Sequence, residues 1–187
     1  MKHVQRLLVL VAGLPLSGKT TVAKLLGEKL GVPVYSLGDV VREEAERVGR
    51  DPGEVASMLR VREGRRAIAS RLAEKLRDTK HEILIVEGVR SIEEVQELCE
   101  KLHASPYILY VAASRPTRER RLQARGRLDD VGMRTVLLRD LRESAYGLTE
   151  LIAYADKILL NDHDDIADLV TDVERVIQDL RKLLLSR

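Results

Sequence analysis

The chain has 187 residues, with 32 Lys and Arg against 30 Asp and Glu, and a formal net charge of +2. This length suits one domain with a buried core, and so small a net charge excludes an overall field that recruits nucleic acid or a membrane. The single cysteine, Cys99, excludes an internal disulfide, and no apolar stretch has the length of a membrane span or a signal peptide, so we expect a cytoplasmic protein.

Apolar runs of strand length alternate with segments of helical periodicity along the whole chain. The expected strands are 7–12, 33–36, 82–87, 107–112 and 157–160. The expected helices are 19–30, 38 or 39 to 48, 54–78 with a break near Gly64, 91–102, 114 to a polar break at 126–131, 132–148 and 165–185. This alternation predicts a single α/β domain over 1–187, with a parallel sheet covered on both faces and ligands beyond the carboxyl ends of the strands.

The segment directly after the first strand is a complete G-x-x-x-x-G-K-[ST] phosphate-binding loop at 13–20. Its glycines allow the backbone to approach phosphate oxygens, and the following helix adds partial positive charge. We expect Lys19 to reach the β and γ oxygens of a triphosphate and Thr20 to hold Mg²⁺. The predicted nucleotide-binding residues are Gly13, Leu14, Pro15, Leu16, Ser17, Gly18, Lys19 and Thr20. A tight turn with a chance Lys-Thr pair is the competing interpretation.

Glu87 ends the third expected strand, where a protein with this loop needs a second acidic group near Mg²⁺. It is a candidate to orient a metal-bound water or to accept a proton from the acceptor. The alternative is a solvated glutamate at a strand end. Gly88 follows, and it fits either the close approach of a ligand or a tight turn.

Asp39 and Arg42 lie at the start of the helix after the second strand, and Arg90 lies just beyond the third. Asp39 by itself is expected to be an ordinary N-cap. Arg42 and Arg90 are candidates to converge on an acceptor phosphate, although either one alone is typical of a surface arginine.

Six arginines lie between residues 115 and 127 with Glu119 as the single acid among them. Arg118, Arg121 and Arg125 fall on one helical face, where three uncompensated cations repel one another unless an anion joins them. A polyphosphate is the expected anion, because phosphoryl transfer spreads negative charge over oxygens. RNA is the competing anion; the near-neutral total charge and the lack of aromatic residues among the arginines argue against it.

Together, 13–20, 36–42, 87–90, Arg121-x-x-x-Arg125 and 127–130 resemble the adenylate kinase family, and more closely an archaeal family of adenylate-kinase-related P-loop proteins. The resemblance covers about residues 6–162. It implies a three-layer α/β/α P-loop NTPase fold with a five-stranded parallel sheet of order 2-3-1-4-5. It also implies an acceptor-binding region at about 36–80 and a small helical lid at about 115–139.

The resemblance further assigns roles to individual residues. By it, Arg42 and Arg90 grip the acceptor monophosphate, and Asp39 lies near the metal. The donor and lid residues that it implies are Arg121 and Arg125 for the triphosphate, Arg127 with Arg139 over the transferred group, and Asp129 with Asp130 as supports of the lid. This chain differs from the family at Leu37, where a threonine is usual, and at Glu87, where an aspartate is usual.

The expected activity is transfer of the γ-phosphoryl group of Mg-ATP to a small acceptor, with a nucleoside monophosphate such as AMP as the leading candidate. Dephospho-coenzyme A kinase is the nearest alternative enzyme. A protein of another class, an ATP-binding switch or ATPase that acts on a protein or RNA partner, is the second alternative. The predicted catalytic set is Lys19, Glu87, Arg121, Arg125, Arg127 and Arg139; the metal set is Thr20, Asp39 and Glu87; the acceptor set is Asp39, Arg42, Gly88 and Arg90.

Overall fold

The computed structural model describes residues 6–125 and 132–185, without the side chains of residues 125 and 132–135. Five parallel strands form one sheet in the order β2-β3-β1-β4-β5, which confirms the predicted α/β class and strand order. The strands are β1 (Arg6–Ala12), β2 (Val34–Ser36), β3 (Ile83–Glu87), β4 (Ala104–Ala112) and β5 (Lys157–Leu160).

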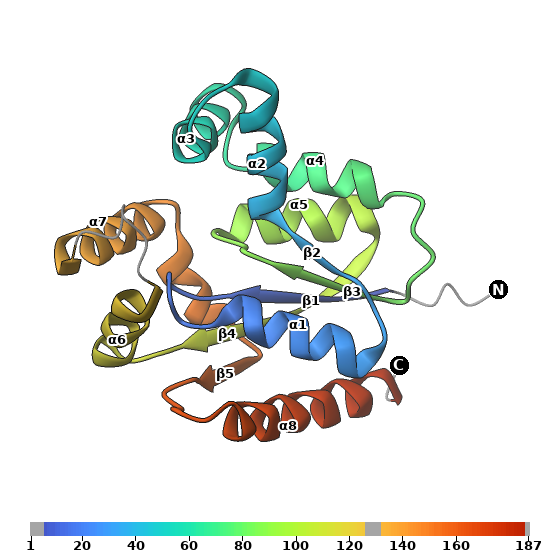
Figure 1. The fold of residues 1–187 in the computed structure, drawn as a ribbon. Helices are drawn as coiled ribbons and strands as arrows, with labels where there is room; N and C mark the ends of the chain where they lie inside the picture. The colour runs from blue at the N-terminus through green and yellow to red at the C-terminus, as the bar shows by residue number, and fades with distance from the viewer. Residues whose placement is uncertain (1–5, 126–131, 186–187) are drawn as a thin grey trace.

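Helices pack on both faces of this sheet (Figure 1). They are α1 (Lys19–Leu30), α2 (Leu37–Val48), α3 (Pro52–Glu63), α4 (Ala67–Leu76), α5 (Ile92–Leu102), α6 (Arg115–Arg125), α7 (Gly132–Ala145), the 3₁₀ helix η1 (Leu148–Tyr154) and α8 (Ile166–Leu185). Figure 1 shows α6 and α7 on the side of the sheet where β4 ends. No helix in the part of the chain described here is both long and apolar enough to cross a membrane.

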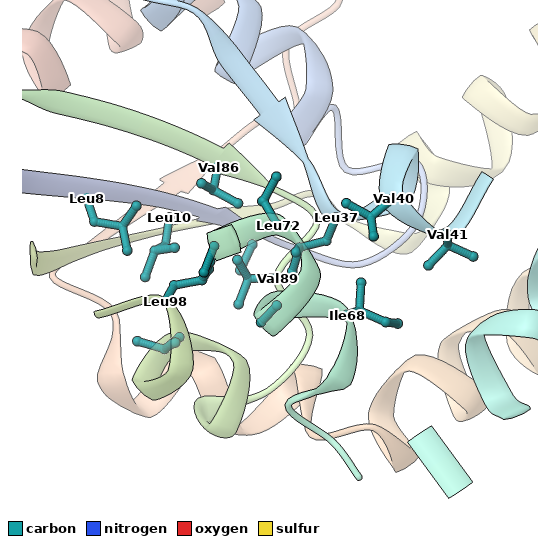
Figure 2. Packing of buried hydrophobic residues seen from close by; sticks show 14 of the residues in the cluster. Leu8, Leu10, Leu37, Val40, Val41, Ile68, Leu72, Val86, Val89 and Leu98 are labelled. Atoms are coloured by element: carbon teal, nitrogen blue, oxygen red, sulfur yellow. The ribbon is translucent and has the colours of Figure 1, made fainter. Parts of the chain in front are cut away.

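The central strand β1 has neighbours on both sides and is buried on both faces, because each residue from Leu7 to Ala12 is an aliphatic with 0% exposure. Alternate side chains enter opposite cores. Leu8 and Leu10 join the core under α2, α4 and α5, as Figure 2 shows, whereas Leu7 and Val9 join the core under α1 and α8. Each fully buried leucine contributes about 1.5–3 kcal/mol relative to an exposed one, so these cores hold β1 and the loop after it in place.

The break expected near Gly64 is present: α3 and α4 are separated there, and Gly64 has φ of 91°. Other boundaries differ from those expected from the sequence. Strand β4 begins at Ala104 instead of 107, and its first residues, including Pro106, pair with β1 alone, because β5 pairs with β4 only from Leu109 onward. A proline, which lacks an N–H, is tolerated where one side of a strand has no ladder partner. The expected helix 132–148 ends at Ala145 and is followed by η1.

Candidate active site

The loop between β1 and α1 has the backbone geometry of a phosphate cradle. Gly13 has φ of 151°, and a Cβ atom there would lie 2.3 Å from the Val111 carbonyl oxygen. Gly18 has φ of 88° and caps α1 in the left-handed region, while Leu16 is also left-handed with φ of 67°. Gly18 supplies no side-chain cap, and the first turn of α1 contains no acidic residue. The free backbone N–H groups and the positive dipole end at the N-terminus of α1 therefore suit an anion.

Three polar side chains meet at the C-terminal end of β3, whose last residue is Glu87. Glu87 Oε2 accepts a hydrogen bond from Thr20 Oγ1 at 3.0 Å, and Glu87 Oε1 accepts one from Ser36 Oγ at 2.9 Å. The strand order places these residues together, because β3 lies between β1 and β2. A hydroxyl next to a carboxylate is a donor set that fits Mg²⁺, which binds few protein oxygens and keeps waters and substrate phosphates as its other ligands.

A cavity of about 370 Å³ opens above the phosphate-binding loop. It is lined by predicted site residues from four separate segments: Gly13, Pro15, Leu16, Gly18, Lys19, Thr20, Arg42, Gly88, Arg90 and Arg139. Its lining also contains Thr21, Val89, Arg142, Glu143 and Leu148, which the sequence did not single out. Leu14 packs against the first core and Ser17 is fully buried, so the side chains of these two loop residues are structural. We call this space the central cavity.

A second cavity of about 180 Å³ shares Arg42, Arg90, Arg142 and Glu143 with the central cavity. Its other lining residues come from α2, from α3 and from the residue directly after α7: Gly38, Val41, Pro52, Gly53, Ala56, Arg60 and Tyr146. Helices α2 and α3 belong to the predicted acceptor region, and α7 precedes η1. The two cavities together are therefore suited to a molecule with an anionic group at the shared boundary and an organic part in the second cavity.

Arg90 is held by carboxylates at this boundary. Its Nε donates to Glu143 Oε2, and its Nη1 is buried without a hydrogen-bond partner among the described residues. Burial works against the charged form of Arg90, but the carboxylates of Glu143 and Glu94 outweigh burial and raise the pKa of Arg90. Arg90 is thus a permanent cation, and part of its guanidinium still needs an acceptor.

A buried ion pair supports the floor of the second cavity. Glu94 has 0% exposure; its Oε1 accepts from Arg60 Nη2 at 2.8 Å and its Oε2 accepts from the Arg90 backbone N–H at 2.8 Å. The Arg60 guanidinium lies over the Tyr146 ring, 4.3 Å from its centroid, and the Tyr146 hydroxyl is 2.8 Å from Ser57 Oγ. Burial raises the pKa of Glu94, although both donors favour its charged form.

Two arginines of α6, Arg118 and Arg121, contact the rest of the protein. Arg118 is almost fully buried and forms an ion pair with Asp140 at 2.8 Å. Arg121 donates through Nη1 to the carbonyl oxygens of Leu16 and Ser17, both at 3.2 Å, and through Nη2 to Asn161. The expectation of an uncompensated cation was therefore wrong for Arg118, because Asp140 compensates its charge. Arg121 fixes the backbone of the phosphate-binding loop, and its role towards a donor triphosphate stays a prediction.

Asn161, at the end of β5, completes this support. Its Nδ2 donates to the Ser17 carbonyl oxygen at 2.8 Å, and a Cβ on Gly18 would lie 2.2 Å from Nδ2. A third cavity of about 400 Å³ also borders Gly18 and is lined in part by Arg121, Asn161 and His163.

Asp39 does not join the Thr20 and Glu87 pair. It forms an ion pair with Arg42 in the first turns of α2, where both side chains are more than half exposed. The sequence had predicted Asp39 as the N-cap of this helix, and this prediction was wrong. Ser36 caps α2, because its side chain accepts a hydrogen bond from the Gly38 N–H. In the described ranges, no three His, Cys, Asp or Glu residues form a group able to hold a metal.

The predicted lid residues are placed only in part. Arg139 lines the central cavity. Arg127, Asp129 and Asp130 lie outside the described residues, as does the side chain of Arg125. The sequence missed Arg142, Glu143 and Tyr146, although Arg139, Arg142 and Tyr146 have the i, i+3, i+7 spacing that puts three side chains on one helical face.

Comparison with known proteins agrees with this arrangement. A family profile described as AAA domain matches residues 12–136. A UPF0200 protein from Pyrobaculum aerophilum is 44% identical over 172 residues, which cover 91% of this chain and 97% of that protein. One from Hyperthermus butylicus is 40% identical and covers 87% of this chain and 89% of its own length. A UPF0200/UPF0201 protein from Archaeoglobus fulgidus is 35% identical over 91% of this chain but only 54% of that longer protein.

Solved structures share the fold at low sequence identity. Shikimate kinase from Bacteroides thetaiotaomicron superimposes with a TM-score of 0.62 at 19% identity, over 94% of this chain and 98% of that one. Shikimate kinase from Acinetobacter baumannii, solved in complex with shikimate, has a TM-score of 0.59 at 16% identity and covers 93% of both chains. At such identities the likeness concerns the P-loop kinase fold alone.

Proposed function

The chain belongs to the archaeal UPF0200 family and contains an AAA domain, and on that premise we propose that it is an ATP-dependent phosphotransferase with a small phosphorylated acceptor. One observation carries this proposal. The phosphate-binding loop with Thr20, which donates to Glu87, and the two arginines Arg42 and Arg90 all border a single cavity. A donor phosphate and an acceptor anion therefore have binding groups on facing sides of one space.

The donor in this proposal is Mg-ATP. Lys19 and the amides of the loop bind the β and γ phosphates, and the third cavity receives the nucleoside. Thr20, oriented by Glu87, would supply a protein oxygen to Mg²⁺, and the ion would supply positive charge next to the phosphates. Arg121 and Asn161 act indirectly, because they hold the loop carbonyls that fix the directions of its amides.

The acceptor in this proposal is a monophosphate bound by Arg42 and Arg90, most plausibly a nucleoside monophosphate such as AMP. Guanidinium forks suit phosphate oxygens, and arginines on the transferred group stabilise the charge that spreads over its oxygens in the transition state. Arg139 lies at the same cavity and is suited to that second role. Catalysis then consists of positioning and charge neutralisation by the protein.

The test is product detection with Mg-ATP and a panel of acceptors: the nucleoside monophosphates, dephospho-coenzyme A, and hydroxyl acceptors without phosphate. We expect transfer to a phosphorylated acceptor, loss of nucleotide binding or turnover in Lys19→Ala, and retained ATP affinity with weakened acceptor binding in Arg42→Ala and Arg90→Ala. Intact ATP binding without transfer to any panel member would defeat the proposal.

A second candidate is an ATP-driven switch that acts on a partner protein. The relative from Archaeoglobus fulgidus favours it, since this chain matches only 54% of a protein whose name joins two families. A nucleotide-driven change in one part of such a protein is able to control the other. Hydrolysis of ATP that depends on an added partner, with no phosphorylated small molecule as product, would support the switch over the kinase.

A further inference from the structure

Arg142 differs from the other arginines at the boundary between the two cavities. Arg42 is paired with Asp39 and Arg90 with Glu143. Arg142 lines both cavities from α7, yet its guanidinium forms no hydrogen bond or ion pair with any residue in 6–125 or 132–185. A cation that faces two cavities without a carboxylate of its own is a candidate to bind an anionic ligand.

Neighbouring backbone leaves room for this guanidinium. Gly53, in the first turn of α3, lines the second cavity, and a Cβ there would lie 3.3 Å from Arg142 Nη1. Any other residue at this position would therefore press on the Arg142 side chain. Because Gly53 has no side chain, the Arg142 guanidinium has room at the boundary, which it shares with Arg42 of α2 and Arg90 of the loop after β3.

The charges at the boundary match a phosphate monoester. Arg42, Arg90 and Arg142 contribute three guanidiniums, and Glu143 contributes the single carboxylate of that shared lining; Asp39, outside this lining, pairs with Arg42. Cations therefore still exceed carboxylates, which suits a phosphate monoester with its charge of about −1.5 to −2 at pH 7. In addition, Arg90 Nη1 is buried without a hydrogen-bond partner in the described structure, so this side of the boundary also lacks an acceptor.

We propose that Arg142 is a specificity-determining residue that binds the anionic group of the acceptor together with Arg42 and Arg90. This inference rests on the proposed function and narrows its acceptor to compounds with a phosphate monoester. The organic part of the acceptor then lies in the second cavity, near Tyr146 and Arg60. A hydroxyl acceptor without phosphate would leave the Arg142 guanidinium without an anion and the Arg90 Nη1 without an acceptor, and we expect it to bind poorly.

The experiment measures anion binding with the donor site already filled. The full-length chain is saturated with Mg²⁺ and the non-hydrolysable analogue AMP-PNP, and AMP or inorganic phosphate is then titrated in by calorimetry. The variants are Arg142→Ala, Arg142→Lys and the control Arg62→Ala. Arg62 is an exposed arginine on α3 that lines neither cavity, so its variant controls for the loss of one positive charge.

We expect Arg142→Ala to weaken binding of AMP or phosphate about 10- to 100-fold, as for the loss of a hydrogen-bonded charge. Arg142→Lys is expected to recover part of this loss, because the ammonium keeps the charge without the fork. Arg62→Ala is expected to bind AMP and phosphate as tightly as the unmodified chain. The affinity for AMP-PNP is expected to stay unchanged in every variant.

Two results would overturn the assignment: Arg142→Ala that binds both probes as tightly as the unmodified chain, or an unmodified chain that binds neither probe. Binding that depends on Arg142 without any phosphoryl transfer would count against the phosphotransferase and would still support this anion site. The two proposals can therefore fail separately.

Discussion

Replacing Glu94 with alanine removes the carboxylate that neutralises the Arg60 guanidinium beneath the second cavity. The Arg60 side chain is 7% exposed and that of Glu94 is 0% exposed, so neither group is solvated by bulk water. The substitution also leaves the Arg90 backbone N–H without its acceptor. Arg60 keeps its contact with the Tyr146 ring and its hydrogen bond to the Ala56 carbonyl oxygen, which do not neutralise its charge.

Removing one partner from a buried ion pair costs about 3–5 kcal/mol, because the remaining charge stays in a low-dielectric interior. Stability of a natural domain is about 5–15 kcal/mol, so Glu94→Ala is expected to remove a large share of it. For a domain of this size, 1 kcal/mol corresponds to about 2–4 °C in melting temperature, which gives a fall of roughly 6–20 °C.

Glu93→Ala is the matched control, because it makes the same substitution one residue earlier in α5. The Glu93 side chain is 35% exposed and pairs at 3.4 Å with Arg65, which is 51% exposed. An exposed pair contributes less than about 1 kcal/mol. Both variants change helix propensity equally, so the difference between them reports the buried contacts of Glu94 with Arg60 and with the Arg90 N–H.

The assay is urea unfolding at pH 8 followed by far-ultraviolet circular dichroism, with a thermal melt of each variant. The reasoning predicts a free energy of unfolding for Glu94→Ala that is at least 2 kcal/mol, on the order expected for a buried charge, below that of Glu93→Ala. If the two variants unfolded within the error of one another, the view of Glu94 as a structural counter-charge would be refuted.

Three further substitutions or modifications probe the site and the core. Glu87→Gln keeps a hydrogen-bond acceptor for Thr20 but removes the charge. The Mg²⁺ concentration that gives half-maximal turnover should therefore rise about 10- to 100-fold, and an unchanged concentration would exclude a role of Glu87 in Mg²⁺ binding. Asn161→Ala removes the amide that donates to the Ser17 carbonyl oxygen, and calorimetry should find ATP binding weakened about 5- to 10-fold, at about 1 kcal/mol per hydrogen bond; equal affinity would contradict the bracing role. Burial raises the pKa of the Cys99 thiol to about 11, so at pH 8 iodoacetamide should alkylate the folded chain roughly 100-fold more slowly than the chain in urea, and faster as pH rises towards 11. Equal rates in urea and in buffer would show that Cys99 is not protected.

The sheet was predictable because its signals are local. The aliphatic run Leu7–Ala12, the glycines of the next loop and the periodicity of α1 each specify their own segment, and the resemblance supplied the strand order. Strand β4 was predicted too short because Ser105 and Pro106 have no strand propensity; pairing with β1 determines their conformation.

The site was predictable where chemistry follows a strand end, and less so where helices approach from elsewhere. Glu87 ends β3 and Arg90 follows it, and the parallel sheet brings both beside the phosphate-binding loop. The partners of Arg118 and Arg121 are backbone carbonyls of that loop together with Asp140 and Asn161, and the loop is about a hundred residues away in the sequence. No spacing rule relates such positions, so the sequence alone suggested an anion instead.

The contact of Arg60 with Tyr146 has a practical consequence for spectroscopy. The chain contains no Trp and five Tyr, so its ultraviolet emission comes entirely from phenol rings. One of these rings borders the second cavity under a guanidinium, at 4.3 Å from its centroid. The molecule thus carries a fluorophore of its own beside the second cavity, where we propose that the organic part of the acceptor binds, and tyrosine emission is a readout of occupancy that needs no attached dye.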